Sequence, residues 1–348
     1  MLQKLVFLIQ MSICGMEPIF FPFFTDFLRS DSTVRPSFAD SSLSDCFPLA
    51  IRFFPPQKIN LGKTSLQDGT FPFSLAFYAD IYIISIFFFR RTIMRIVIKI
   101  GTSTLAHPTG HMNIRRVQEL CRVLSDMKNA GHEVILVSSG AIGMGVGKLG
   151  LSSRPEDIPG KQAAAAVGQC ELMYTYDKLF GEYHHTVAQL LITGEDMKND
   201  IRHQNFSNTL GRLLQLGVLP IINENDTVAT DEISIGDNDT LAALVATSIG
   251  ADKLVLLSDI DGVYTADPHT DPDAKLIPVI KEVDDSIMAL AGNAGSSLGT
   301  GGMITKLQAA KICLAAGCTM IITNGADPDN LYWIMDGEPV GTAFIPEE

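Results

Sequence analysis

Short apolar runs alternate with longer amphipathic stretches from residue 94 onward. The run at 95–100 is rich in Ile and Val, and at 114–127 the apolar residues recur every three or four positions, which predicts a strand followed by a helix. Further apolar runs lie at 133–138, 186–192, 218–222, 253–258 and 319–323, separated by helical stretches such as 160–183 and 238–250. This part of the chain therefore predicts repeated strand–helix units.

The apolar runs carry almost no polar alternation, which is typical of strands that are covered on both faces. We therefore predict an α/β fold, a three-layer α/β/α sandwich with a mainly parallel central sheet and right-handed crossovers. In open sheets of this kind, ligands bind beyond the carboxyl ends of the strands. The loops that follow the apolar runs are the candidate binding segments.

Residues 1–93 have a different composition. Of the 19 phenylalanines, 16 lie before Met94, and this segment shows no sustained helical or strand period. The stretch 71–89 approaches membrane-spanning length, but Pro72 and Asp80 interrupt it, so we expect no membrane anchor. We interpret residues 1–93 as a disordered extension or the product of a mis-assigned start, and residues 94–348 as the functional domain.

Charge and cysteine content limit the partners and the compartment. Residues 94–348 contain 18 basic and 32 acidic side chains, a formal net charge of −14. Sequence-independent binding to nucleic acid needs Lys and Arg that neutralise phosphates, so we expect no nucleic-acid partner. The 6 cysteines form no CxxC pair, and we expect buried reduced thiols and a cytoplasmic location.

Two strand ends suggest an anion site. The first strand ends with Lys99 just before Gly101, and because an unpaired buried ammonium is costly, we place Lys99 at the mouth of a phosphate pocket. A lysine on an edge strand that reaches out to water is the alternative. The second strand leads into the glycine-rich segment 138–145, whose backbone N–H groups could approach an anion, although tight packing needs glycine too.

Later loops add polar groups that suit an amino acid and a nucleotide. Residues 223–227 and 237–239 offer Asn, Asp and Glu side chains that suit ammonium and carboxylate groups, with a solvated acidic loop as the alternative. Residues 258–268 could bracket a nucleotide and its metal, or simply form turns. Residues 299–306 form a glycine-rich entry to a helix that carries Lys306, and two lysines can stabilise a transferring phosphoryl group without covalent chemistry.

Six segments in this order resemble the glutamate 5-kinases of the amino acid kinase family. They are KIGTS at 99–103, SSGAIGMG at 138–145, NENDTVA at 223–229, GDND at 236–239, SDIDGVYTADP at 258–268 and GTGGMITK at 299–306. The resemblance runs from Met94 to about Ile345. The glycine and lysine elements are shared across the wider family, whereas the SSGAI, NENDTVA and GDND elements are particular to the glutamate enzymes.

The resemblance implies a kinase that uses ATP and Mg²⁺ to phosphorylate the side-chain carboxylate of L-glutamate, giving L-glutamyl 5-phosphate in the first step of proline biosynthesis. It assigns phosphoryl transfer to Lys99 and Lys306, with Asp239 holding both lysines. It assigns glutamate binding to Ser139, Asp226 and Asn238. It assigns ATP contacts to Lys99, Ser258, Asp259, Thr300, Gly301, Gly302, Met303, Ile304, Thr305 and Lys306. It assigns no metal ligands.

The same resemblance implies an acid-binding lobe at about 94–250 and a nucleotide-binding lobe at about 251–348. It also implies a homo-oligomer, feedback inhibition by proline, and hand-over of the product to glutamyl phosphate reductase. Many members of the family carry a C-terminal PUA domain, and this chain is similar to the short forms without it.

Three rival interpretations stay open, one of which is a membrane-tethered protein that uses residues 71–89 as its anchor. An acetylglutamate or aspartate kinase would share the glycine and lysine elements, and only the substrate loops would differ. A non-catalytic amino-acid sensor on the same fold would be expected to lose one of the two lysines or the acid between them, and Lys99, Lys306 and Asp239 are all present.

Overall fold

The computed structural model describes residues 93–107, 111–229, 238–268, 270–293 and 300–347, and the side chains of 291–301 lie outside the description. All of these residues belong to one compact unit, Ala76–Glu348. The predicted extension therefore lies outside the described residues, except for residue 93. So do the 71–89 stretch and Gly236 and Asp237 of the GDND segment.

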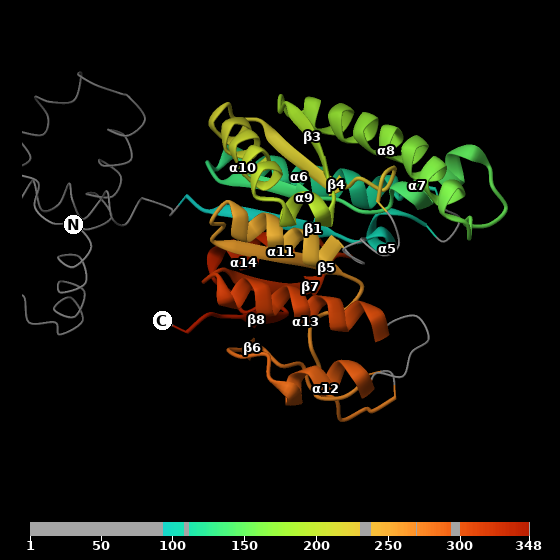
Figure 1. Cartoon of the computed structure of the whole chain (residues 1–348). Coiled ribbons are helices and arrows are strands. Elements are labelled where there is room, and N and C mark those ends of the chain that lie inside the picture. Colours follow the sequence, from blue (N-terminus) through green and yellow to red (C-terminus); the bar gives the residue numbers. More distant parts are fainter. Residues whose placement is uncertain (1–92, 108–110, 230–237, 269, 294–299, 348) are drawn as a thin grey trace, which may run out of the picture. The chain divides into compact units, whose positions relative to one another are not determined.

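Eight strands of the described residues form one sheet (Figure 1). They are β1 (Arg95–Ile100), β2 (Glu133–Val137), β3 (Val187–Ile192), β4 (Leu219–Glu224), β5 (Lys253–Ser258), β6 (Val279–Ile280), β7 (Thr319–Asn324) and β8 (Thr342–Phe344). Their order is β3-β4-β2-β1-β5-β7-β8-β6, and every pairing is parallel except the antiparallel pair β7–β8. The predicted, mainly parallel sheet is confirmed, and each of the six apolar runs is a strand.

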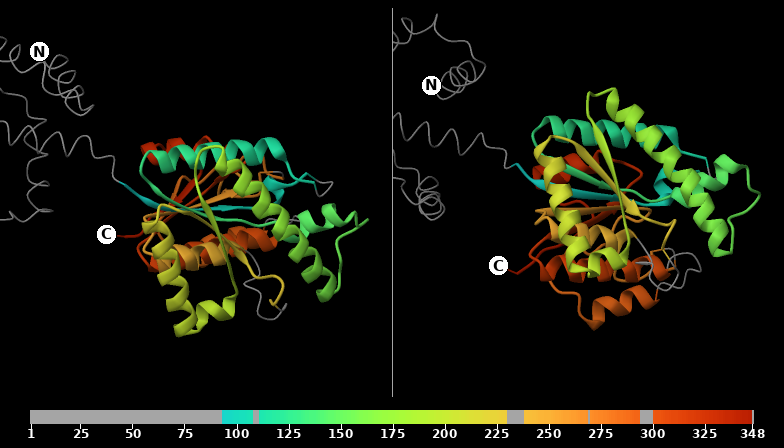
Figure 2. Two further views of the ribbon diagram at one scale, coloured as in Figure 1. Left: turned by 90° about the horizontal axis from the view of Figure 1, so that it is seen from above. Right: turned by 45° about the horizontal axis from the view of Figure 1, so that its top comes forward.

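Helices cover both faces of the sheet, so the predicted three layers are confirmed (Figure 2). The helices are α5 (Thr102–Leu105), α6 (Ile114–Asn129), α7 (Ala141–Leu149), α8 (Ile158–Gly181), α9 (Gly194–Lys198), α10 (Asp200–Gln215), α11 (Asn238–Ser248), α12 (Asp285–Asn293), α13 (Thr300–Ala315) and α14 (Asn330–Asp336). One apolar core joins the sheet to α10, α11 and α13, and a second joins its other face to α6, α7, α8 and α14.

The central strands owe their uniform apolar pattern to these two cores. On β1, Val97 packs in the core with α10, α11 and α13, whereas Ile96 and Ile98 pack in the core with α6 and α8. Successive strand residues point to opposite faces of the sheet, and both faces are buried. Residues 96–98 of the strand are therefore all apolar and show no alternation of polar and apolar residues. Burying a side chain of this size stabilises the fold by roughly 1.5–3 kcal/mol.

The strands divide evenly between the two predicted lobes. The first four strands, from residues 95–224, form the β3-β4-β2-β1 half of the sheet, and the last four form the other half. The sheet is continuous between Lys99 of β1 and Leu256 of β5, which pair in register. The separate binding tasks of the two lobes stay a prediction.

Two glycines let α7 and α8 pack backbone against backbone. A Cβ atom at Gly145 of α7 would lie 1.8 Å from the carbonyl oxygen of Ala164, and one at Gly168 of α8 would lie 1.8 Å from that of Ala141. Any larger residue would force the helices apart. The glycines of the SSGAIGMG segment therefore serve packing as well as the turn before α7, where Gly140 has a φ of +94°.

Two smaller expectations concern cysteines and membranes. The four described cysteines are free, but Cys170 is exposed, so the expectation of burial is wrong for this one residue. Its position on the outer face of α8 explains the exposure. Among the described helices, none combines the length and apolar composition that crossing a bilayer requires.

Candidate active site

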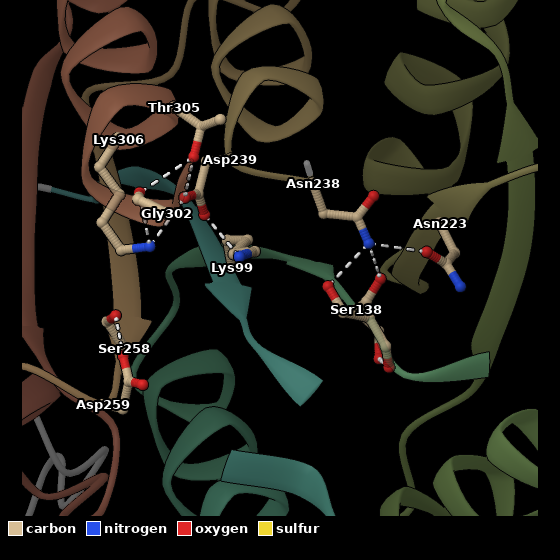
Figure 3. Close-up of polar contacts among 11 residues, drawn as sticks. Lys99, Ser138, Asn223, Asn238, Asp239, Ser258, Asp259, Gly302, Thr305 and Lys306 are labelled. Carbon is tan, nitrogen blue, oxygen red and sulfur yellow. Dashed lines mark hydrogen bonds and ion pairs between the residues drawn. The ribbon is translucent and has the colours of Figure 1, made fainter. Parts of the chain in front are cut away.

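A buried carboxylate joins two lysines at the carboxyl end of the central strand (Figure 3). Lys99 is the fifth residue of β1, Asp239 lies in the first turn of α11, and Lys306 lies in the second turn of α13. The Nζ atom of Lys99 is 2.5 Å from Oδ1 of Asp239, and that of Lys306 is 3.0 Å from Oδ2. Three residues far apart in the sequence thus form one ion cluster.

The cluster is almost completely shielded from water. The side chain of Asp239 is 0% exposed, and those of Lys99 and Lys306 are 7% and 10% exposed. Burial raises the pKa of Asp239, but the charges and hydrogen bonds of the two lysines outweigh it and hold that pKa below its usual value. With both lysines protonated, the cluster carries one uncompensated positive charge, which suits an anionic ligand.

The first two turns of α13 hold the second lysine in place. Lys306 also donates to the carbonyl oxygen of Gly302 at 3.3 Å, and the hydroxyl of Thr305 lies 3.4 Å from Oδ2 of Asp239. Met303 and Ile304 pack against the core. Thr300 and Gly301 lie within α13, but their side-chain environment is outside the described residues. The predicted ATP contacts of this segment stay a prediction.

A cluster of carboxamides lies on the other side of Lys99, at the ends of β2 and β4. The Nδ2 atom of Asn238 donates to Oγ of Ser139 at 2.7 Å and to the carbonyl oxygen of Ser138 at 2.9 Å. It also lies 2.9 Å from Oδ1 of Asn223, whose own Nδ2 donates to Oε1 of Gln169 at 2.9 Å. Of the predicted glutamate-binding residues, the structure brings Ser139 and Asn238 into direct contact.

Asp226 is the third predicted glutamate-binding residue and stands apart from that contact. It follows β4 in the loop whose next residues are tied to α8 by a hydrogen bond from Gln162 to the carbonyl oxygen of Ala229, 3.2 Å long. Burial raises the pKa of Asp226, and the positive charge of Arg154 partly opposes this. Within the described residues, the side chain of Asp226 makes no hydrogen bond, and its predicted role in binding glutamate stays a prediction.

The predicted nucleotide contacts Ser258 and Asp259 lie at the end of β5, on the opposite side of Lys99 from the carboxamides (Figure 3). Ser258 is buried and donates to the carboxylate of Asp259 at 3.0 Å, whereas Asp259 is exposed. The loop is tied to the end of β7, because the N–H of Gly325 donates to the carbonyl oxygen of Ser258 at 2.7 Å.

Two residues of this site were given no individual role by the sequence, although Asn223 belongs to the segment 223–227 that was predicted to bind an amino acid. Asn223 lies within the predicted polar loop and is a central member of the carboxamide cluster. Gln169 lies within α8 in a run of small and apolar residues, and only the close packing of α8 on α7 brings it to the site. Within the described part of the chain, no group of three His, Cys, Asp or Glu side chains could hold a metal ion.

A separate surface cleft of about 550 Å³ lies at the start of α6 and beside Ala326. It is lined by residues that include His107, Arg115 and Arg116, and it shares no residue with the ion cluster or the carboxamides.

The sequence pattern of the amino acid kinase family matches residues 94–324. The glutamate 5-kinase of Clostridium perfringens (strain 13 / Type A) is 51% identical over 258 residues, which cover 73% of this chain and 96% of the relative. That of Listeria innocua serovar 6a is 53% identical, covering 73% and 94%. For that of Caldanaerobacter subterraneus the identity is 53%, covering 73% and 68%.

Solved structures show the same fold at much lower identity. The carbamate kinase of Giardia lamblia bound to AMP-PNP superimposes with a TM-score of 0.53 at 19% identity, covering 74% of this chain and 100% of that one. The UMP kinase of Ureaplasma parvum gives a TM-score of 0.51 at 17% identity, covering 73% and 99%. At these identities the likeness concerns the fold alone.

Proposed function

Because the chain belongs to the amino acid kinase family and, within it, to the glutamate 5-kinases, we propose that it phosphorylates the side-chain carboxylate of L-glutamate with ATP. The product is L-glutamyl 5-phosphate, the intermediate that begins proline biosynthesis. The observation that carries the proposal is the buried Lys99–Asp239–Lys306 cluster, which places a net positive charge between two sets of polar loops.

The two lysines stabilise the phosphoryl group during transfer. Phosphoryl transfer needs positioning and charge stabilisation more than covalent chemistry, and fixed cations in a water-poor site supply both. Asp239 fixes the two ammonium groups so that they need not reorganise when negative charge develops. The attacking carboxylate of glutamate is ionised at neutral pH, because its ordinary pKa is about 4.3, so no general base is required.

The carboxamide side of the site binds the amino acid. The hydroxyl of Ser139 accepts from Asn238, so its own hydrogen can be donated to a carboxylate of the substrate. The carboxamide oxygen of Asn238 and the carboxylate of Asp226 provide acceptors for the α-ammonium group. A free amino acid matches this pair of acceptors, whereas an N-acetylated one lacks the ammonium group, which favours glutamate over acetylglutamate.

The nucleotide side of the site is formed by the loop at Ser258 and Asp259 and by the start of α13. We assign ATP to these residues and to Thr300–Lys306, with Lys99 reaching the phosphoryl group from the other side. Mg²⁺ bound to ATP as part of the substrate would neutralise charge on the phosphate oxygens. We further assign a cytoplasmic homo-oligomer, inhibition by proline at the glutamate site, and hand-over of the labile product to glutamyl phosphate reductase.

The proposal is tested by ATP-dependent and Mg²⁺-dependent formation of glutamyl hydroxamate from L-glutamate and hydroxylamine. N-acetylglutamate and aspartate serve as rival substrates. Lys306→Met should lower the rate at least about 100-fold, since positioned charges contribute factors of this size. Lys311→Met makes the same chemical change at an exposed position of α13 and should leave the rate unchanged.

Each outcome separates the interpretations. Hydroxamate formed with glutamate, and lost in Lys306→Met but not in Lys311→Met, supports the proposal. Activity with only N-acetylglutamate or only aspartate would leave the kinase assignment intact and change the assigned substrate. If the protein is folded but has no activity on any of the three acids, the interpretation as an amino-acid sensor would replace the interpretation as a kinase.

A further inference from the structure

Gln169 connects α8 to the substrate side of the site through a chain of carboxamides. Its Oε1 atom accepts from Nδ2 of Asn223 at 2.9 Å, and Oδ1 of Asn223 accepts from Nδ2 of Asn238 at 2.9 Å. Asn238 in turn donates to Ser139 at 2.7 Å. Gln169, a half-buried residue of a helix, is thus connected by hydrogen bonds through Asn223 to Asn238 and Ser139, two of the predicted glutamate-binding residues.

The chain of hydrogen bonds has a fixed direction. Oδ1 of Asn223 also accepts from the backbone N–H of Glu224 at 2.9 Å, and a backbone N–H can only donate. The carboxamide nitrogen of Asn223 must therefore face α8, where Gln169 supplies the acceptor. Asn223 is 2% exposed, so without Gln169 this nitrogen would be buried with an unpaired hydrogen, which is costly.

The direction of the chain, together with the backbone carbonyl oxygen of Ser138, decides what Asn238 offers to a ligand. Its nitrogen faces three acceptors, on Ser138, Ser139 and Asn223, and its carboxamide oxygen points away from them (Figure 3). Within the described residues this oxygen has no hydrogen-bond partner. An acceptor turned away from this cluster suits an ammonium group, whereas a reversed carboxamide would present N–H groups there and repel it.

The packing of α8 fixes Gln169 at the required place. Gly168, the residue before it, lies where α8 comes closest to α7, and Tyr176, two turns further on, shares a hydrogen bond of 3.0 Å with the hydroxyl of Ser138. Gln169 and Tyr176 are seven residues apart and lie on the same face of the helix. One face of α8 therefore contacts the ends of both β2 and β4.

We propose that Gln169 is a positioning residue for the amino-acid substrate: it anchors Asn223 and thereby keeps the carboxamide oxygen of Asn238 turned toward the α-ammonium group. The inference rests on the proposed function. It assigns Gln169 no contact with the reacting atoms, only control over how Asn238 and Ser139 are presented.

Two substitutions separate the acceptor from the shape of the side chain. Gln169→Met keeps an unbranched side chain of similar length and removes the acceptor, whereas Gln169→Glu keeps an acceptor oxygen. The assays are the KM values for L-glutamate, for ATP and for glutarate, which is glutamate without the α-ammonium group. Thermal unfolding checks that each variant folds, and Gln169→Leu, which also lacks an acceptor, replaces the Met variant if that variant is unstable.

We expect Gln169→Met to raise the KM for glutamate about tenfold, equivalent to about 1.4 kcal/mol, while the KM for ATP stays within about twofold. The preference for glutamate over glutarate should fall by about the same factor, and Gln169→Glu should restore most of it. These results would support the inference.

Three results would overturn the inference. One is a native glutamate-to-glutarate preference in Gln169→Met, another is an equal rise in the KM values for ATP and glutamate, and the third is a Glu variant as impaired as the Met variant. In each of these cases the native enzyme still phosphorylates glutamate, and the proposed function stands. A native enzyme without glutamate-dependent activity would overturn both.

Discussion

Asp239→Asn is the substitution that tests the ion cluster most directly. The change keeps the shape of the side chain, removes its charge and turns one of the two oxygens that contact the lysines into an N–H donor. Asp239 is 0% exposed and is contacted by Lys99 at 2.5 Å and Lys306 at 3.0 Å, so the variant leaves two nearly buried ammonium groups without a counter-charge. We therefore expect both lower stability and altered ligand binding.

The magnitude follows from the burial. Removing one partner of a buried ion pair costs about 3–5 kcal/mol, because the remaining charge has lost its water and its partner. We expect the free energy of unfolding to fall by about that amount. The net charge of the cluster rises from one to two, so a polyphosphate should bind on the order of tenfold more tightly. The rate of phosphoryl transfer should fall on the order of 100-fold, because the lysines lose their fixed positions.

The measurements are urea unfolding with and without a non-hydrolysable ATP analogue, together with the rate of hydroxamate formation. The control is Asp177→Asn, the same chemical change at an exposed position of α8, which should alter stability by less than about 0.5 kcal/mol. Native-like stability of Asp239→Asn, or weaker binding of the analogue, would refute the reasoning.

The pH dependence of the same variant has a definite sign. The lysines hold the folded pKa of Asp239 below its unfolded value of about 3.9. The stabilisation is therefore fully present above that unfolded value and is lost as the pH falls through the lower folded value. The stability difference between the native protein and Asp239→Asn should be constant near neutral pH and should narrow in acid.

Three further predictions concern packing, a buried hydroxyl and substrate binding. Gly168→Ala should lower the free energy of unfolding by about 3 kcal/mol in thermal or urea unfolding, because its Cβ would lie 1.8 Å from the α7 backbone. The control Gly211→Ala in α10 meets no atom within 4 Å and should raise the free energy of unfolding by about 0.5–1 kcal/mol. Equal effects of the two substitutions would contradict this packing. Thr342→Val should cost about 1–3 kcal/mol in urea unfolding, because the N–H of Val263 loses its 2.8 Å acceptor, and an unchanged midpoint would contradict it. Burial raises the pKa of Asp226, so Asp226 should become protonated, and the KM for glutamate should rise, at a higher pH than it would if this carboxylate were exposed. Asp226→Asn should give a high KM that does not depend on pH in this range. A native pH profile of KM in that variant would exclude a role for ionised Asp226 in binding.

The sequence predicts the central sheet well because its strands are buried on both faces. The run at 253–258 is apolar at its four central positions, 254–257, and becomes β5, with neighbours on both sides. The strands β6 and β8 are only two and three residues long and pair with each other, and β8 also pairs with β7. Runs this short carry no period of their own, so only the tertiary structure defines them.

The site is predictable to the extent that its residues follow strands in recognisable segments. Lys99 could be predicted because it is a charged residue within an apolar run. Lys306 could be predicted because it lies in a helix with a glycine-rich start. Gln169 follows from neither, because it lies inside a helix whose neighbouring residues are Ala, Val, Gly and Cys. Its contact with Asn223 depends on how closely α8 approaches α7, which is a property of two helices and not of one segment.

The place of Lys99 in the sheet explains how one short strand can serve both substrates. β1 lies between β2, which leads to Ser139, and β5, which ends at Ser258, so the ammonium group of Lys99 lies on the boundary between the carboxamides and the nucleotide loop. A phosphoryl group that passes from one side to the other must cross this boundary. Lys306 reaches the same point from α13 because Asp239 attracts both cations. We therefore expect Asp239 to determine where in the site the phosphoryl group is transferred, and the flanking loops to determine which donor and acceptor bind.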